Sequence, residues 1–256
     1  MSQQLTATVT AARDPRVAAL RRLAIVPAYN EEGSLGRVLE EIRAADPQLE
    51  IVVVDDASTD GTGRVARAAG VSVIRMPFNT GIGGAMKTGY QFARDQGFDV
   101  AVQVDADGQH DARHVQRLIT PIALGAADLV IGTRFAGKRV YHATPGRRMG
   151  MVLFTAVAWA LTRRRLTDPT SGFRAVNRKG IELFAAEYPH DFPEVESNVL
   201  AVRHGLRVLE VPVKMRARAA GRSTVTSLRG TYFVIRILLA LFVSVFRRYP
   251  KPMEEP

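Results

Sequence analysis

Two aspartates spaced by one residue carry the clearest chemical signal in the chain. Asp105 and Asp107 follow the apolar run that begins at Val100, and Gln109 and His110 come shortly after them. Carboxylate and amide oxygens are hard ligands, which Mg²⁺ and Mn²⁺ prefer. An ion held by Asp105, Asp107 and Gln109 would bridge a diphosphate and neutralise the charge that develops on a leaving phosphate. The alternative is a turn whose aspartates cap the next helix, but the place after a buried strand favours a metal site.

A second group of side chains has the types that hold a nucleoside. Asp55 ends the β-branched run EIVVVD and Asp56 follows it. Adjacent carboxylates repel unless each has its own partner, and one of them can accept hydrogen bonds from a ribose hydroxyl or a base N–H. The stretch PAYNEE, which begins at Pro27, adds an aromatic ring at Tyr29 and a carboxylate at Glu31.

A glycine-rich stretch, NTGIGGA (Asn79–Ala85), opens a helix. Backbone N–H groups at a helix N-terminus attract anions, so the stretch resembles a phosphate-binding loop. However, it lacks the GxxxxGK[ST] and GxGxxG patterns and follows the third expected strand rather than the first. We therefore expect it to pack closely around the site, with phosphate contact as the alternative.

Short apolar strands alternating with amphipathic helices must position these residues. Strands are expected at Leu23–Pro27, Glu50–Asp55, Val71–Met76, Val100–Asp105, Asp128–Thr133, the end of Asp168–Val176, and Leu206–Val213. Helices are expected from Ser34 as N-cap through Ile42, and over Thr62–Ala69, Gly84–Gln96, Arg113–Leu124, Arg178–Ala186 and Glu194–His204. The alternation predicts an α/β, Rossmann-like, mainly parallel sheet flanked by helices. Ligands bind beyond the carboxyl ends of such strands, where the polar residues lie, so we expect an enzyme.

Size and composition fit this interpretation. The chain has 256 residues, 46% of them hydrophobic, which is enough for one large domain. It contains no cysteine, which excludes disulfides and thiolate metal sites. The formal net charge of +10 suits nucleic acid, an anionic membrane surface or phosphorylated substrates. No zinc-finger spacing or RNA-recognition signature is present, so no nucleic-acid partner is expected.

As an ordered set, these motifs resemble the catalytic domain of glycosyltransferase family 2, which has the GT-A fold. The resemblance is closest to the polyprenyl-phosphate sugar synthases, such as dolichol-phosphate mannose synthase and the bacterial undecaprenyl-phosphate sugar synthases. It covers roughly residues 24–223. The matching stretches are PAYNEE, VVDDASTDGT, NTGIGGA, QVDADGQHD, GTRF and DPTSGFRAV.

The resemblance implies an inverting transferase that uses a UDP- or GDP-sugar and a divalent metal. The residues implied at the nucleotide are Pro27, Tyr29, Glu31, Val54, Asp56 and Ala106, and those at the metal are Asp105, Asp107 and Gln109. The arginines implied at the phosphates are Arg134, Arg147 or Arg148, Arg174, and Arg218 of the RxxGxS stretch ARAAGRS. The stretch EVESN, with Glu194 and Glu196, does not match a family pattern, so its role is open.

The acceptor is expected to be polyprenyl phosphate. A phosphate monoester has a second pKa near ~6, so it needs no general base at neutral pH, whereas a sugar hydroxyl does. It needs positive charge instead, and the segment after the fifth expected strand is rich in arginine, including Arg147, Arg148 and the run RRR at 163–165. This favours a lipid phosphate.

Two apolar stretches place the enzyme at a membrane. Met149–Thr162 and Tyr232–Phe246 are shorter than the ~20 residues that span a bilayer, and basic residues flank both. We expect a leader over 1–22 without a signal-peptide core, a catalytic domain over 23–226, a membrane-surface helix over 227–247 and a tail over 248–256. The protein would lie peripherally or shallowly inserted at the cytoplasmic face. A buried or oligomer contact is the alternative for these helices, which leaves a homo-oligomer or a small membrane partner protein open.

Three other functions compete with this one. A polysaccharide glycosyltransferase would use Asp168, Glu194 or Glu196 as a general base. A sugar-phosphate nucleotidyltransferase would carry a glycine-rich basic loop after the first strand, where PAYNEE stands instead. A basic membrane- or nucleic-acid-binding module would leave the acidic residues at the strand ends unexplained, since they would repel a phosphate backbone.

Overall fold

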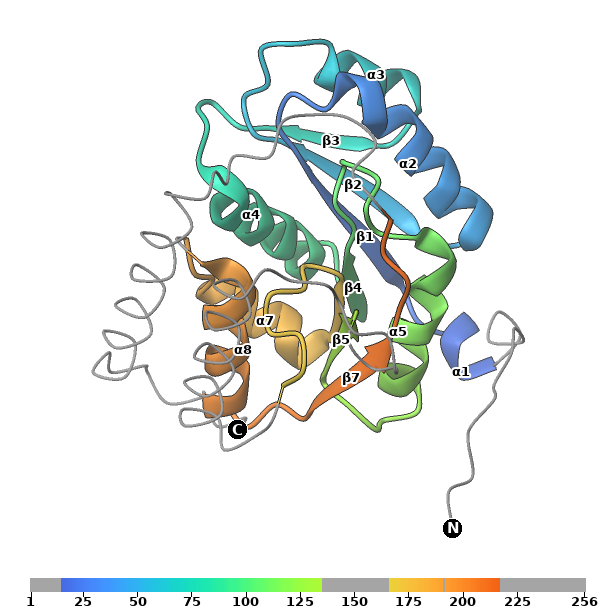
Figure 1. Cartoon of the computed structure of the whole chain (residues 1–256), viewed down its shortest axis with the longest axis vertical. Helices are drawn as coiled ribbons and strands as arrows, with labels where there is room; N and C mark the ends of the chain where they lie inside the picture. The colour runs from blue at the N-terminus through green and yellow to red at the C-terminus, as the bar shows by residue number, and fades with distance from the viewer. Residues whose placement is uncertain (1–14, 135–165, 191, 217–256) are drawn as a thin grey trace, which may run out of the picture.

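A seven-stranded sheet forms the centre of the protein, ordered β3-β2-β1-β4-β6-β5-β7 (Figure 1). The computed structural model describes residues 15–134, 166–190 and 192–216. The strands are β1 (Arg22–Ala28), β2 (Glu50–Asp55), β3 (Ser72–Arg75), β4 (Val100–Gln103), β5 (Leu129–Thr133), β6 (Arg174–Asn177) and β7 (Val208–Pro212). Every strand pair is parallel except the two that β6 makes with β4 and β5. The prediction of a mainly parallel α/β sheet is confirmed.

The strand register brings the candidate residues to one edge of the sheet. Ala28 pairs with Asp55, and Asp55 pairs with Arg75, so β1, β2 and β3 end level with one another. Gln103 at the end of β4 pairs with Arg174 at the start of β6, because these strands are antiparallel. The loops that follow β1, β2 and β4, and the loop that precedes β6, therefore leave the sheet on the same side.

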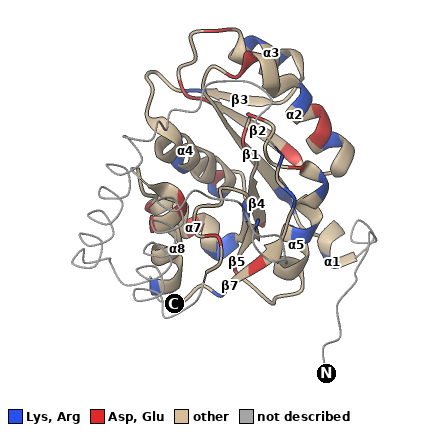
Figure 2. Cartoon of the chain, viewed as in Figure 1, with Lys and Arg blue, Asp and Glu red and all other residues tan. Residues whose placement is uncertain are grey.

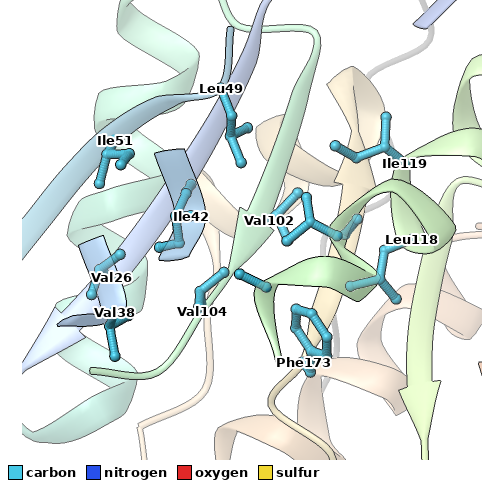
Figure 3. Close-up of a cluster of buried hydrophobic side chains, with 14 of the residues drawn as sticks. Val26, Val38, Ile42, Leu49, Ile51, Val102, Val104, Leu118, Ile119 and Phe173 are labelled. Atoms are coloured by element: carbon cyan, nitrogen blue, oxygen red, sulfur yellow. The ribbon is translucent and has the colours of Figure 1, made fainter. Parts of the chain in front are cut away.

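Helices cover both faces of the sheet (Figure 1). On one face lie α1 (Pro15–Ala18), α2 (Glu32–Ala45), α3 (Thr62–Ala68), the 3₁₀ helix η2 (Ala112–His114) and α5 (Val115–Ala123), and on the other α4 (Gly81–Asp95), α7 (Arg178–Ala186) and α8 (Pro193–Arg203). The two faces bury separate hydrophobic clusters. In the first, Val38 and Ile42 of α2 pack near Val26 of β1, and Leu118 of α5 lies near Phe173 (Figure 3).

Two predicted helix starts are wrong. Ser34 lies inside α2 rather than at its N-cap, and its hydroxyl donates to the Glu31 carboxylate over 2.7 Å. Helix α4 begins at Gly81 rather than Gly84, because the carboxylate of Asp56 accepts hydrogen bonds from the backbone N–H groups of Thr80 and Gly81. That cap is distant in the chain, so no local pattern marks it.

Several sequence-based predictions lie outside the described residues. They are the leader before residue 15, the apolar stretches 149–162 and 232–246, and the three arginines Arg147, Arg148 and Arg218. Within the ranges that the structure describes, no helix has both the length and the apolar composition needed to cross a bilayer.

Asp128 ties the far end of the sheet together. Its carboxylate accepts hydrogen bonds from the backbone and guanidinium of Arg207, just before β7, and from the Asn177 amide, at the end of β6. The backbone N–H and C=O of Asp128 also bond to Arg207 and Asn177. The Arg207 hydrogen bonds lower the pKa of Asp128 to about 2. One side chain thus holds the ends of three neighbouring strands, β5, β6 and β7.

We predict that Asp128→Asn lowers the free energy of unfolding by about 1–2 kcal/mol at pH 7, because an amide cannot accept all of these bonds and part of the ion pair with Arg207 is exposed to solvent. The lowered pKa means that wild type loses this stabilisation as the pH falls from about 3.8 towards about 2. The difference between the two proteins should therefore shrink over that range. Urea unfolding as a function of pH measures it.

Asp95→Asn serves as the control, since Asp95 is an exposed aspartate beside Arg94 at the end of α4. It should change stability little. An Asp128→Asn variant as stable as Asp95→Asn at pH 7 would contradict the role given to Asp128.

Candidate active site

The loop after β4 presents the two predicted metal-binding carboxylates. The backbone N–H of Gln109 donates to Asp107 Oδ1 over 3.0 Å, and the Gln109 side-chain amide donates to Asp107 Oδ2 over 2.9 Å. Asp107 is buried, whereas the Asp105 side chain is 33% exposed. The donor set of two carboxylates and one amide fits Mg²⁺ or Mn²⁺ by its chemistry. Among the described residues, no group of three or more His, Cys, Asp or Glu side chains is placed to hold a metal. The binding of a metal by Asp105, Asp107 and Gln109 stays a prediction.

His110 holds this loop against the sheet. Its Nδ1 accepts a hydrogen bond from the backbone N–H of Asp105 over 3.0 Å, so in the neutral ring the proton resides on Nε2. Nε2 lies 3.5 Å from Asp105 Oδ2. The imidazole stacks on Phe173, just before β6, with 4.7 Å between ring centroids. His110 thus fixes the backbone of Asp105, a role that its sequence spacing alone does not indicate.

Gly172 allows β6 to approach the same loop. A Cβ atom at this position would lie 2.9 Å from Gln103 Nε2 and 3.3 Å from Asp105 Oδ2. Gln103 Nε2 itself donates to Asp105 Oδ1 over 3.0 Å. A side chain at position 172 would therefore displace the hydrogen bond that orients Asp105.

The loops after β1 and β2 bind each other. The Asn30 backbone N–H donates to Ser58 Oγ over 3.0 Å, and Asn30 Oδ1 accepts from the Thr59 backbone N–H over 2.8 Å. Asn30 has φ 54° and Ala57 has φ 60°, a left-handed conformation that is uncommon outside glycine. This arrangement leaves Tyr29 at the surface with 48% of its area exposed, available for a nucleoside.

The adjacent aspartates after β2 have separate partners, as their repulsion requires. Asp55 accepts hydrogen bonds from the Ser58 backbone N–H and from the Arg75 guanidinium. Asp56 accepts three from the start of α4: from the backbone N–H and hydroxyl of Thr80 and from the Gly81 N–H. Both carboxylates are buried and serve the fold. Nucleoside contact by Asp56 stays a prediction.

The glycine-rich start of α4 packs closely, as expected. A Cβ atom at Gly83 would collide with the backbone of Pro189 and His190, and one at Gly84 would collide with the Thr80 side chain. Gly83 therefore allows α4 to lie against the segment that follows α7, and Gly84 leaves room for the Thr80 side chain at the N-cap of α4. Phosphate contact by this stretch stays a prediction.

Arg134 forms a two-point ion pair with Asp168. Its Nε donates to Asp168 Oδ2 and its Nη2 donates to Oδ1, both over 2.7 Å. Asp168 is fully buried, and the Arg134 side chain is partly exposed. Because both oxygens of Asp168 already accept from the guanidinium, this carboxylate is poorly placed to act as a general base.

Arg174 is the largest fully buried side chain of the described chain. Its guanidinium donates to the carbonyl oxygens of Ser171 and Glu194 and to the hydroxyl of Ser197. All of these partners are protein atoms, and a phosphate would have to displace them. These bonds position α8 beside the site, and the predicted phosphate contact by Arg174 stays a prediction.

Glu194, whose role the sequence left open, lies at the start of α8. Burial raises the pKa of its carboxyl group, the positive charge of Arg174 lowers it, and the negative charge of Asp105 adds to the rise. Hydrogen bonds place α8 near the loop after β4, because Arg174 donates to the Glu194 carbonyl and pairs in the sheet with Gln103, whose side chain donates to Asp105. The sequence around Glu194 does not predict this position, because the position depends on hydrogen bonds that the buried Arg174 makes.

The remaining predicted residues form the apolar support of the site. Pro27 and Val54 are buried in β1 and β2, and Ala106 is buried between Asp105 and Asp107. Glu31 lies at the N-cap of α2, where its backbone N–H donates to Thr62 Oγ1 over 2.8 Å. The structure thus places the predicted nucleoside and metal residues at the same edge of the sheet.

Comparisons with known proteins agree with this geometry. The undecaprenyl-phosphate mannosyltransferase of Micrococcus luteus is 35% identical over 80% of this chain and 87% of its own length. The polyprenol monophosphomannose synthase of Mycolicibacterium smegmatis is 32% identical over 79% of this chain and 80% of its own. The GT-A fold is shared with glucosyl-3-phosphoglycerate synthase of Mycobacterium tuberculosis, solved with Mn²⁺, uridine-diphosphate-glucose and phosphoglyceric acid. That structure aligns with a TM-score of 0.69 and 20% identity over 94% of this chain and 86% of its own.

A family model matches residues 23–184, which include β1 to β6 and the loop with Asp105 and Asp107. Together with the relatives above, this match shows that the chain belongs to glycosyl transferase family 2.

Proposed function

We propose that the protein transfers a hexose from a UDP- or GDP-sugar to polyprenyl phosphate, with inversion at the sugar carbon, at the cytoplasmic face of a membrane. The observation that carries the proposal is the meeting of Asp105 and Asp107 with the loops after β1 and β2 at one sheet edge. The acceptor class is supported by the names of the two relatives, which both describe transfer of mannose to a polyprenyl phosphate or polyprenol monophosphate.

Asp105, Asp107 and Gln109 would hold Mg²⁺ or Mn²⁺, which supplies positive charge to the diphosphate leaving group. Tyr29, Glu31 and Asp56 would bind the nucleoside from the loops after β1 and β2. Arg134, Arg147, Arg148 and Arg218 would contact the phosphates, because guanidinium groups match phosphate oxygens in geometry and charge.

The acceptor attacks without a general base in this proposal. A phosphate oxygen is already ionised near pH 7, so the protein needs only to bring it to the sugar carbon. The engagement of both Asp168 oxygens by Arg134 supports this, since it removes one of the residues that a sugar-hydroxyl acceptor would require as base.

One observation favours a second candidate function, transfer to a sugar hydroxyl. Glu194 lies near Asp105 and has a raised pKa, which is the tuning that a general base needs. Glu196 is partly buried on the same helix. The two functions share the fold, the donor site and the metal site, and they differ in whether Glu194 takes a proton.

The metal site is tested by Asp107→Ala in the full-length protein. Transfer should fall by at least about a thousandfold, because the diphosphate would then leave without its counter-charge. EDTA should abolish wild-type transfer, and Mg²⁺ or Mn²⁺ should restore it. Asp95→Ala controls for loss of a carboxylate outside the metal site, because Asp95 is exposed at the end of α4. Full turnover of wild type in metal-free buffer would disprove the metal role.

The acceptor is tested by Glu194→Gln. With polyprenyl phosphate as acceptor, kcat should stay within about tenfold of wild type, because no proton needs to be removed. If Glu194 were the base, activity would be lost as the pH falls below the pKa of its carboxyl group. Because that pKa is raised, the loss would come at a higher pH than for an ordinary glutamate. Glu194→Gln would then lower kcat by at least about a thousandfold and abolish the loss of activity at low pH. Such a result would favour the hydroxyl acceptor.

Membrane association is tested by neutralising the basic flank of the last apolar stretch. Substituting Arg247, Arg248 and Lys251 by Gln should weaken binding to anionic vesicles by about 1 kcal/mol per charge, measured by sedimentation. Neutralising exposed Arg43, Arg67 and Arg117 of the catalytic domain is the matched control and should have less effect. Equal binding by both variants would contradict the proposed membrane surface.

A further inference from the structure

The segment after β7 pairs with the loop that carries the metal-binding residues. The backbone N–H of Arg216 donates to the carbonyl of Gln109 over 2.9 Å, and Met215 forms an antiparallel bridge with His110. Residues 215 and 216 are therefore in direct backbone contact with the end of the predicted metal set. The side chain of Arg216, which has no place in the catalytic roles above, extends this contact.

The Arg216 guanidinium joins three parts of the fold. Nη1 donates to both carboxylate oxygens of Glu41 in α2, over 2.8 and 2.6 Å. Nη2 lies 3.1 Å from Oδ1 of Asp111, which caps η2 just after the metal loop. The Arg216 side chain is 30% exposed and Asp111 is buried. Both signs of charge lie along α2 (Figure 2), and Glu41 also accepts a hydrogen bond from Arg37 one turn earlier in that helix, over 2.9 Å.

These ion pairs lie on the side of the metal loop that faces α2, where side chains do not fill the space beside the turn. Gly108 has φ 77° and forms the turn between Asp107 and Gln109. It lines a small hollow together with Gly33 and Val38 of α2, and Glu41 and Arg216 lie on the same hollow. The hollow separates this side of the turn from α2, and the ion pairs of Arg216 connect the turn to α2 across it.

We propose that Arg216 is a positioning residue that holds the turn of Asp107 and Gln109 in the conformation that binds the divalent cation. The inference rests on the proposed metal role of that loop and adds a residue to which no role had been given. The Arg216 side chain acts through Glu41 and Asp111, which keep residue 216 in place with its backbone N–H bonded to the Gln109 carbonyl, and it does not touch the metal. Residues that orient metal ligands in this way typically change metal affinity about 10- to 100-fold when they are replaced.

The test is Mn²⁺ binding to the full-length protein, with free Mn²⁺ measured by electron paramagnetic resonance. Arg216→Ala should raise the Kd for Mn²⁺ by about tenfold. In the transfer assay, the concentration of Mn²⁺ that gives half-maximal rate should rise by the same factor, while kcat at saturating Mn²⁺ is largely retained. Arg216→Lys, which keeps the charge but cannot bridge Glu41 and Asp111 with a planar fork, should show a smaller rise.

The matched control is Arg113→Ala. Arg113 also pairs with Asp111 but is largely exposed and makes no contact with Gln109 among its recorded hydrogen bonds. Arg113→Ala removes one positive charge from beside Asp111, as Arg216→Ala does, but it leaves the ion pair between Arg216 and Glu41 of α2 intact. The Kd for Mn²⁺ should therefore stay within about twofold of wild type. Glu41→Gln should reproduce most of the Arg216→Ala effect, and the double variant should bind Mn²⁺ no more weakly than Arg216→Ala alone.

Two outcomes would overturn the inference. If Asp107→Ala abolishes Mn²⁺ binding but Arg216→Ala, Arg216→Lys and Glu41→Gln all bind as wild type, Arg216 does not position the loop, and the proposed function stands. If Asp107→Ala binds Mn²⁺ as well as wild type, the loop is not the metal site, and the metal role in the proposed function fails together with this inference. Should Arg216→Ala not fold, Arg216→Lys and Glu41→Gln decide the matter.

Discussion

The buried guanidinium of Arg174 is the interaction on which the arrangement around Asp105 depends. A buried charge is costly unless its hydrogen-bonding capacity is used, and Arg174 uses most of it on Ser171, Glu194 and Ser197. Because Arg174 opens β6 opposite the end of β4, these bonds place both α8 and the loop before β6 beside Asp105. An antiparallel strand in a mainly parallel sheet is what makes this possible, since its start lies at the edge where the parallel strands end.

Most acidic residues at this edge are used by the protein itself. Asp55, Asp56 and Asp168 are buried and accept hydrogen bonds from neighbouring loops, helix starts or an arginine. Asp105 differs, because a third of its side chain is exposed while His110 fixes its backbone. The edge therefore combines buried carboxylates that make the loops rigid with the partly exposed carboxylate of Asp105, an arrangement that would preorganise the proposed metal site.

The sequence predicted the parts of the fold that follow local rules. The strand over Glu50–Asp55 and the helix over Arg178–Ala186 agree residue for residue, because a β-branched run and a capped amphipathic segment need no distant partner. The predicted start of α4 was wrong because Asp56 caps it from another loop. The contacts of Arg174 and Glu194 could not be predicted for the same reason, since burial and long-range hydrogen bonds decide them.

Two arginines at this edge of the sheet are fixed by carboxylates. Arg134 is bound at two points to Asp168, and the hydroxyls of Thr133 and Thr167 beside this pair lie 2.9 Å apart. Arg216 is bound to Glu41 and Asp111, and its backbone N–H donates to the Gln109 carbonyl. Because these ion pairs hold both guanidinium groups in place before any substrate binds, neither group has to be ordered when an anionic substrate arrives.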